Sequence, residues 1–186
     1  DDDFKAAGAQ IIEGPDKVWA EADLLLKVKE PIEPEYSRMR KGQTLFTYLH
    51  LAASRPCTDA LLASGTTSIA YETVQTADGA LPLLAPMSEV AGRLSAQVGA
   101  YHLMRTQGGR GVLMGGVPGV APAKVVVIGG GIAGDNAAAV AWGMGAHVTV
   151  FDLNINILRK IDAEYGGAIE TRYSSRLDLE DAVKQA

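Results

Sequence analysis

The chain lacks most of the features that mark secreted, membrane-spanning and nucleic-acid-binding proteins. Its 186 residues include one cysteine, Cys57, which cannot form an internal disulfide and is interpreted as a small core hydrophobe. A lone thiol favours a reducing compartment, and we predict the cytoplasm. No apolar run is long enough to cross a membrane, and the acidic start Asp1–Phe4 is unlike a signal peptide. The net charge of −5 and the absence of a basic cluster argue against nucleic acid as a partner.

The chain also lacks the patterns of several classes of catalytic site. It has no GxSxG, no P-loop lysine and no cysteine–histidine pattern. Its histidines are scattered without the carboxylate spacing of a metal centre, so we expect no metal site. His102 falls within a long helical pattern and His147 begins a strand, and both are interpreted as structural or surface residues. His50 is the histidine left for chemistry.

One stretch carries the pattern of a dinucleotide-binding turn. The apolar run Val125–Ile128 predicts a buried parallel strand, and an alanine-rich helical segment follows soon after it. Between the two lie Gly129, Gly131 and Gly134 in the spacing GxGxxG. The first glycine suits the tight turn, the second leaves room for a pyrophosphate against the backbone, and the third lets the helix pack close to the strand. The free N–H groups and positive dipole end of that helix also favour a phosphate.

A second apolar strand strengthens this interpretation. Residues His147–Phe151 lead into Asp152, which lies about 20 residues beyond the glycines, as the pattern requires. A carboxylate there accepts hydrogen bonds from the adenosine ribose and repels a 2′-phosphate, so the sequence predicts NAD as the cofactor. The alternative is a glycine-rich turn in another parallel α/β fold.

Short apolar runs alternate with helical patterns along the chain, which predicts an α/β protein built on parallel sheets. Strands are predicted at residues 10–12, 23–28, 44–49, 67–70, 124–128, 147–151 and 168–170. Helices are predicted at residues 3–7, 16–19, 57–64, 87–105, 136–144, 156–164 and 179–185. Asp78-Gly79 is interpreted as the turn of a hairpin between residues 73–76 and 81–84.

The longest predicted helix covers Met87–Arg105. Ser88 is its expected N-cap, and Arg105 in the last turn suits the helix dipole. The apolar side chains at helical spacing along it are expected to face the core: Ala91, Leu94, Val98 and Tyr101.

Glycine and proline crowd residues 107–122, and we place a domain boundary near residue 120. Residues 1–120 and 121–186 are predicted to form two Rossmann-like parallel-sheet domains that face each other across a cleft, the second of them binding NAD. Both domains are expected to be incomplete. No strand precedes the first helix, and the second domain ends after too few strands for a doubly wound fold.

Two candidate site residues follow strands of the first domain. Lys29 comes just after an apolar strand, where Pro31 disfavours its continuation, and His50 ends another. Ligands of open parallel sheets bind beyond the carboxyl ends of strands, so the two side chains share a crevice if the strands are neighbours. The alternatives are a solvated loop charge for Lys29 and a helix-cap or packing role for His50.

Several segments resemble the alanine dehydrogenase family, in the same order and over essentially the whole chain. These segments are Lys27–Pro31, Leu49–Ala52, Ala85–Gly92, Gly115–Gly119 and the dinucleotide motif. Lys-Glu-Pro alone is shared with the NAD-binding component of proton-translocating transhydrogenase, whereas the other segments favour alanine dehydrogenase.

The resemblance implies reversible oxidative deamination of L-alanine to pyruvate and ammonia with NAD. It assigns substrate binding to Lys29 and acid/base chemistry to His50, which makes residues 1–120 the catalytic domain. It also implies a homohexamer. The cofactor contacts that it adds to the glycines map onto Ser88, Ile132, Ala133, Asp152 and Ser174.

These roles agree with the chemistry of the side chains. Histidine titrates near neutral pH and suits the donation of a proton as the oxygen of pyruvate leaves as water. A lysine ammonium can hold the anion of the substrate or polarise its carbonyl group.

The chain also departs from the family pattern. A substrate-binding arginine would precede Asp1 and a catalytic aspartate would follow Ala186, so the 186 residues alone are expected to show little or no turnover. Ile157 stands where the family often has a basic residue beside the ribose-binding acid, which leaves Arg159 and Lys160 as candidate substitutes. A transhydrogenase component and a non-catalytic nucleotide-binding module remain the alternative interpretations.

Overall fold

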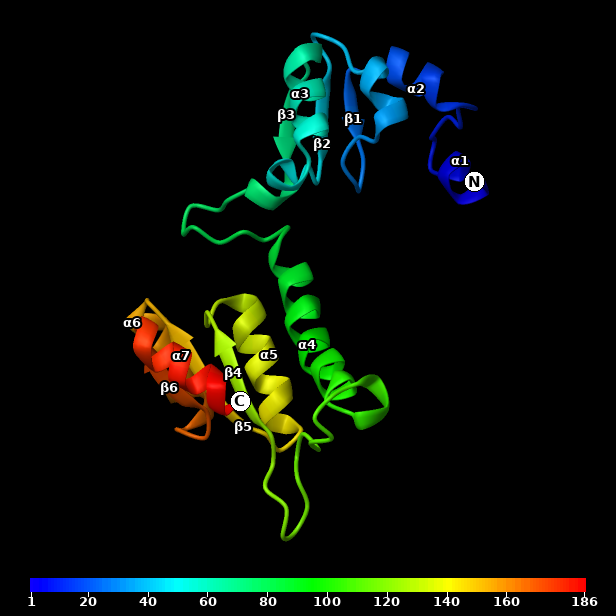
Figure 1. Ribbon diagram of the computed structural model, residues 1–186. Coiled ribbons are helices and arrows are strands. Elements are labelled where there is room, and N and C mark those ends of the chain that lie inside the picture. Colours follow the sequence, from blue (N-terminus) through cyan, green and yellow to red (C-terminus); the bar gives the residue numbers. More distant parts are fainter. The chain divides into compact units, whose positions relative to one another are not determined.

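The computed structural model describes residues 1–186 as two compact units, Asp1–Leu84 and Ala85–Ala186. Each unit holds one parallel sheet, as predicted, and each sheet has three strands (Figure 1). The contacts assign the long helix to the second unit, because it packs along another helix there. The functional boundary near residue 120 stays a prediction.

The first unit is built around the sheet β1-β2-β3, with register pairs such as Leu25 opposite Leu45. Its elements are α1 (Asp2–Ala6), α2 (Pro15–Glu21), β1 (Leu24–Leu26), the 3₁₀ helix η1 (Glu33–Arg38), β2 (Thr44–Thr47), η2 (Leu51–Ala53), α3 (Arg55–Ser64), β3 (Thr67–Ala70) and η3 (Tyr71–Thr73). Alternate residues of β2 are buried, because successive side chains of a strand point to opposite faces.

The core of the first unit lies on one face of this sheet. It consists of Trp19, Leu25, Met39, Leu45, Leu49, Cys57 and Leu61. Cys57 is fully buried, which confirms its interpretation as a core residue, and burial raises the pKa of its thiol. A neutral thiol of this kind is a poor nucleophile.

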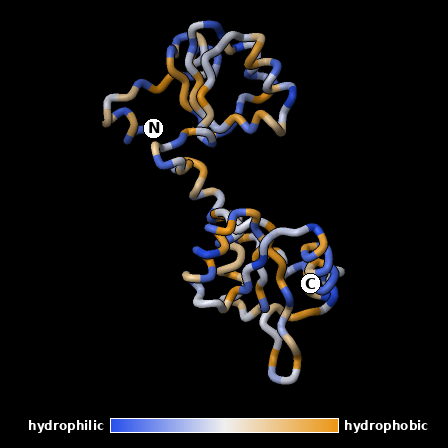
Figure 2. Tube along the Cα trace, turned by 90° about the vertical axis from the view of Figure 1, so that its left-hand side faces the viewer, coloured by the Kyte–Doolittle hydropathy of each residue, from blue (hydrophilic) through white to orange (hydrophobic).

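The second unit is built around the sheet β4-β5-β6. Its elements are α4 (Ala85–His102), η4 (Arg105–Gln107), β4 (Lys124–Ile128), α5 (Ile132–Gly143), β5 (His147–Asp152), α6 (Ile155–Tyr165), β6 (Glu170–Tyr173) and α7 (Arg176–Gln185). The central strand β5 supplies the fully buried Val150 and Phe151, and Ile161 of α6 and Ile169 are buried as well. Figure 2 shows α7, near the C-terminus, as a largely hydrophilic coil, and none of its residues is buried.

Two predicted strand features are wrong. Residues 10–12 form no strand, since Ile11 is exposed and no neighbouring strand accepts their backbone hydrogen bonds. The predicted hairpin keeps its turn, with the Thr76 N–H donating to the Ala80 carbonyl at 2.9 Å, but has no strands. Pro82 lacks the N–H that a continuing ladder would need.

The packed face of the long helix also differs from the prediction. Leu94, Val98 and Tyr101 are about half exposed, whereas Gly92 and Ala96 are buried. The backbones of α4 and α5 approach closely, and this leaves room only for small residues on the face of α4 toward α5. A Cβ atom on Gly92 would lie 2.1 Å from the Ala133 carbonyl oxygen.

The ends of several elements shift as well. The long helix begins at Ala85, with Pro86 in the first turn where proline is tolerated, so Ser88 lies inside the helix and is not its N-cap. It ends at His102, and Arg105 belongs to η4. Helix α5 begins four residues before the predicted start, directly after the glycine turn, and β6 begins at Glu170, where the predicted strand was to end.

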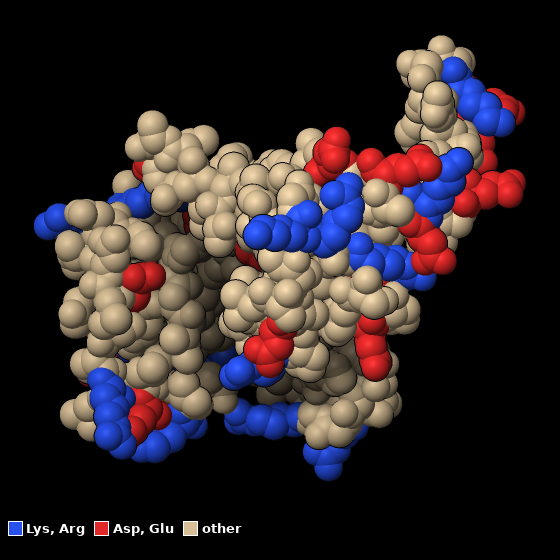
Figure 3. Space-filling model, turned by 90° about the horizontal axis from the view of Figure 1, so that it is seen from above, with Lys and Arg blue, Asp and Glu red and all other residues tan.

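The structure contains no helix with both the length and the hydropathy that a bilayer crossing requires. On the face that Figure 3 displays, basic and acidic side chains are interspersed among uncharged ones. The two exposed histidines lie where they were predicted, His102 at the end of α4 and His147 at the start of β5.

Candidate functional site

The glycine turn between β4 and α5 has the predicted geometry. Gly129 has φ +92°, a conformation that side chains rarely adopt, and its N–H donates to the Phe151 carbonyl at 2.7 Å. A Cβ atom on Gly134 would lie 1.8 Å from the Gly129 carbonyl oxygen, so only glycine allows this approach of helix to turn. The predicted tight turn at Gly129 and the predicted close packing of the helix at Gly134 are confirmed.

The space beside Gly131 suits a phosphate group. A Cβ atom there would meet no heavy atom within 4 Å, so the backbone is open to a ligand. Gly131 is the N-cap of α5, and Ile132 and Ala133 are its first residues. The first N–H groups of a helix have no intrahelical partner, and the helix dipole adds positive potential at this end. A hollow of about 310 Å³ lies against the turn, and Gly130, Gly131, Ile132 and Lys160 are among its lining residues. This open backbone fits the diphosphate of a dinucleotide.

Asp152 lies beside this turn at the carboxyl end of β5. Its Oδ2 accepts a hydrogen bond from the Gly130 N–H at 2.7 Å, and its Oδ1 accepts one from the Asn154 N–H at 2.7 Å. The Ser174 N–H donates to the Asp152 backbone carbonyl at 3.0 Å. The structure therefore brings the glycines, Asp152 and Ser174 together at one edge of the sheet.

Ser88 occupies the first turn of α4, half-buried and one turn before Gly92. Because Gly92 packs against Ala133 near the start of α5, helix α4 carries Ser88 on the part of the second unit that holds the glycine turn.

Arg159 and Lys160 are the candidate substitutes for a basic residue at position 157, and neither forms a hydrogen bond with Asp152. Arg159 donates to the Asn156 side chain, and Lys160 pairs with Asp135 at 3.0 Å. Ile157 instead fills the space below the turn, since a Cβ atom on Gly130 would lie 2.7 Å from its Cγ2.

Asp135, itself buried, is the centre of a polar cluster next to this site. Its two carboxylate oxygens accept hydrogen bonds from Lys160 and from the Tyr165 hydroxyl, each at 3.0 Å. Burial, with the hydrogen bond to Asp135, raises the pKa of Tyr165 to about 12. The hydrogen bond to Asp135 likewise raises the pKa of Lys160, against the effect of burial. The cluster ties α5 to α6 and leaves Lys160 neutralised by its partner.

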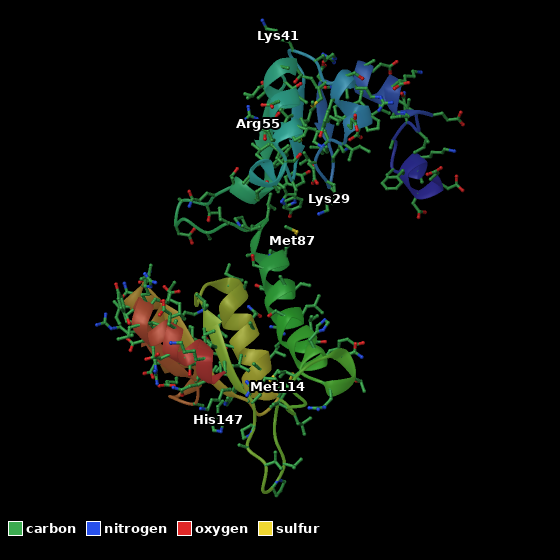
Figure 4. The ribbon with its side chains drawn as sticks, viewed as in Figure 1. Lys29, Lys41, Arg55, Met87, Met114 and His147 are labelled. Atoms are coloured by element: carbon green, nitrogen blue, oxygen red, sulfur yellow. The ribbon has the colours of Figure 1, made fainter.

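In the first unit, Lys29 and His50 follow neighbouring parallel strands. The contact between the two segments continues past both strands, as the Tyr48 N–H donates to the Val28 carbonyl at 3.4 Å and the Thr47 hydroxyl donates to the Lys29 carbonyl at 2.9 Å. Lys29 is exposed, and Figure 4 shows it at the end of the unit opposite to Lys41. The predicted neighbourhood of the two strand ends is thus confirmed for the backbone.

His50 adopts an unusual conformation. Its φ is 47° and its ψ 39°, in the left-handed region, and its side chain is 38% exposed. It stands at the N-cap of η2, but its imidazole makes no capping hydrogen bond, which argues against a helix-cap role. The imidazole lies parallel to the Tyr48 ring, with centroids 6.0 Å apart, and its Nε2 lies 4.0 Å from Oε2 of Glu30.

Sequence reasoning missed three residues of these sites. Gly130 binds Asp152, Glu30 faces the imidazole, and Glu72 accepts hydrogen bonds from the His50 and Leu49 N–H groups. Glu72 lies two residues past the end of a predicted strand, which is parallel to its neighbour. Its position at the carboxyl end of β3 was therefore a signal in the sequence.

The parallel sheet and the glycine turn place the second unit in the class of Rossmann-type α/β domains. Comparison with known families gives an assignment for both units of the chain. Residues 1–91 match the alanine dehydrogenase/PNT N-terminal domain, and residues 95–186 match its C-terminal domain. The chain belongs to the alanine dehydrogenase/PNT family.

Individual relatives agree with this assignment. Over all 186 residues the chain is 84% identical to an alanine dehydrogenase of Mycolicibacterium smegmatis, covering 50% of that protein. It superimposes on a solved L-alanine dehydrogenase with a TM-score of 0.83 and 50% identity, covering 100% of this chain and 51% of that one. A transhydrogenase from Sinorhizobium meliloti gives a TM-score of 0.67 and 25% identity, with coverage of 99% and 53%. The chain spans about half the length of the curated relatives it matches.

Proposed function

We propose that the protein is an NAD-dependent alanine dehydrogenase, which interconverts L-alanine with pyruvate and ammonia. The observation that carries this proposal is the 84% identity to an alanine dehydrogenase over every residue of the chain. At that level of identity the side chains proposed for chemistry and their surroundings are expected to serve the same reaction.

In this proposal the nucleotide is held by the second unit. The open backbone at Gly131 and the start of α5 at Ile132 and Ala133 receive the diphosphate, and Gly129 and Gly134 shape the turn. Asp152 accepts hydrogen bonds from the adenosine ribose, and its charge selects NAD over NADP. Ser88 and Ser174 are proposed as further contacts. The nicotinamide, when bound, supplies the hydride chemistry.

The first unit supplies the groups that act on the substrate. The exposed ammonium of Lys29 holds the carboxylate of alanine or pyruvate and polarises its carbonyl group. His50 transfers a proton to or from the substrate oxygen as water enters or leaves. Glu30, 4.0 Å from the imidazole, stabilises the positive charge that forms when the imidazole takes the proton.

The decisive experiment is NADH oxidation with pyruvate and ammonium, using the protein expressed from its complete gene. We expect turnover in the wild type and a loss of about 100-fold or more in His50→Ala. His102→Ala is the matched control, since His102 lies exposed at the end of α4. Wild-type protein without pyruvate-dependent oxidation would refute the function, whereas equal rates in the two variants would refute only the role of His50.

A transhydrogenase component is the second candidate, favoured by the structural match to the protein from Sinorhizobium meliloti at a TM-score of 0.67. Such a protein exchanges hydride between nucleotides without pyruvate. Hydride transfer from NADH to a nucleotide analogue, in the absence of pyruvate and ammonium, would favour this candidate.

The resemblance to alanine dehydrogenases further suggests a homohexamer, which sedimentation of the protein would test. Its place in the cytoplasm is proposed from the single buried thiol of Cys57.

A further inference from the structure

His50 is held in a backbone conformation that its own side chain does not favour. It is the one residue of the chain other than glycine with a positive φ. The left-handed region crowds a Cβ atom against the following carbonyl, so few residues other than glycine occupy it, and surrounding contacts commonly hold those that do. Such residues concentrate at functional sites.

The contact that imposes this conformation comes from Glu72. Oε1 of Glu72 accepts hydrogen bonds from the His50 N–H at 2.7 Å and from the Leu49 N–H at 3.1 Å, and Oε2 lies 3.2 Å from the same Leu49 nitrogen. Two successive backbone N–H groups thus converge on one carboxylate. Since β2 and β3 are parallel neighbours, the residues that follow them lie at the same edge of the sheet.

The carboxylate is suited to remain charged in this place. Burial tends to raise the pKa of Glu72, but the hydrogen bonds from its own N–H and from those of His50 and Leu49 hold that pKa below its ordinary value. Hydrogen bonds to a charged acceptor are roughly twice as strong as those between neutral groups, so this clamp can offset the strain.

The imidazole itself is placed by few other contacts. It lies parallel to the Tyr48 ring and 4.0 Å from Glu30, and it makes no hydrogen bond with the protein. Tyr48 is in turn buttressed by the edge of Tyr71, at 5.0 Å between centroids. The direction of the imidazole therefore follows from the turn of the backbone that carries it.

We propose that Glu72 is a positioning residue for His50, and that its carboxylate clamps the left-handed turn that presents the imidazole to the substrate. The inference rests on the proposed acid/base role of His50. It assigns to Glu72 no contact with substrate or cofactor.

The test compares Glu72→Ala and Glu72→Gln in the protein expressed from its complete gene. Glu33→Gln is the matched control, because Glu33 is exposed in η1 and forms no ion pair. We expect Glu72→Ala to lower kcat for pyruvate amination by about 10- to 100-fold, as a misplaced catalytic group does. Glutamine keeps one acceptor oxygen but loses the charge, so Glu72→Gln should recover part of kcat.

Two readouts separate positioning from a general loss of structure. The KM for NADH should change by less than about threefold, since the nucleotide is held by the other unit. The limb of the pH profile of kcat that His50→Ala abolishes should also weaken in Glu72→Ala but persist in Glu33→Gln.

The strain has an independent test in stability. His50→Gly should melt at a higher temperature than His50→Ala, because glycine adopts a φ of 47° freely whereas alanine does not. Equal melting temperatures would contradict the strain.

The outcomes separate this inference from the function on which it rests. No turnover in the wild type would end both. An active wild type with a folded Glu72→Ala within about twofold of Glu33→Gln would overturn the positioning role alone. If Glu72→Ala does not fold, the same comparison with Glu72→Gln decides.

Discussion

The backbone N–H of Gly130 donates a 2.7 Å hydrogen bond to the carboxylate of Asp152. This contact ties the glycine turn after β4 to the end of β5, across neighbouring strands. Asp152 therefore has a structural partner in addition to its proposed ligand, the adenosine ribose. The second of its oxygens is held by the Asn154 N–H, so the orientation of the whole carboxylate is set before any nucleotide arrives.

Removing the charge of Asp152 should weaken nucleotide binding and relax its selectivity. Asp152→Asn keeps one acceptor oxygen but no longer repels a 2′-phosphate, so we expect NADH to bind about tenfold more weakly and NADPH to gain relative to NADH. Fluorescence titration with both nucleotides measures this. Asp162→Asn, at an exposed position of α6, is the control. Unchanged affinities in Asp152→Asn would contradict the ribose role.

Substitution of two glycines by alanine should have different effects, on nucleotide affinity at Gly131 and on stability at Gly134. At Gly131 a methyl group meets no neighbour and φ is −67°, so the free energy of unfolding should change by less than about 0.5 kcal/mol while NADH affinity falls about tenfold or more. At Gly134 the methyl group meets the Gly129 carbonyl at 1.8 Å, and we expect a loss of about 1–3 kcal/mol. Calorimetry and nucleotide titration on both variants check the pair. A Gly131→Ala protein with normal affinity would argue against a phosphate at that position.

Gly130 and Ile157 should be energetically coupled. A methyl group on Gly130 would lie 2.7 Å from Cγ2 of Ile157, so Gly130→Ala should destabilise the protein by about 1–3 kcal/mol. Truncation of Ile157 to alanine opens that space and should reduce the effect, with an interaction energy of about 0.5–3 kcal/mol in a double-mutant cycle. Denaturant unfolding of the four proteins gives this energy, and strict additivity would show that the two positions do not compete for space.

Helix α4 offers a matched pair of glycines. A methyl group on Gly92 would lie 2.1 Å from the Ala133 carbonyl oxygen, so Gly92→Ala should force the two helices apart and destabilise the protein by about 1–3 kcal/mol. Gly99 has open space around it, and Gly99→Ala should stabilise the protein by about 0.4–1 kcal/mol through helix propensity. Thermal unfolding of the two variants tests this. Similar effects at both positions would mean that α4 does not pack as described.

The Tyr165–Asp135 hydrogen bond should make stability depend on alkaline pH. The pKa of Tyr165 is raised to about 12 in the folded protein, so the phenol holds its proton more tightly there than in the unfolded chain. Its contribution to stability is complete below about pH 10 and is lost as the pH rises toward the folded-state value. Wild type should therefore lose stability relative to Tyr165→Phe between about pH 10 and about pH 12, as measured by urea unfolding. Tyr173→Phe, at an exposed tyrosine, should follow the wild type.

Local patterns in the sequence predicted what depends on local geometry. The run Val125–Ile128 followed by glycines predicted a buried strand and a tight turn. The structure has the strand and the turn, with Gly129 in the left-handed region, but only Val127 of the run is buried and Ile128 is 66% exposed. The strand before His50 and the strand before Lys29 were also predicted from short apolar runs, and the alternation of strands and helices predicted a parallel sheet. That these two strands are neighbours was left open by the sequence and is given by the structure. Such features arise from hydrogen bonding and side-chain volume within a few residues, which the order of the amino acids records directly.

Contacts between distant segments were decided by the tertiary structure. Hydropathy predicted that Leu94 and Val98 lie in the core. Because α4 packs closely against α5, the buried residues are instead Gly92 and Ala96. The left-handed turn at His50 depends on the carboxylate of Glu72, which lies more than 20 residues away in the chain and follows another strand. No hydrophobic periodicity in the sequence predicts these hydrogen bonds. The sequence therefore determines which residue types are present for binding and proton transfer. The orientation of those side chains is set by backbone groups that come into contact only when the sheets have formed.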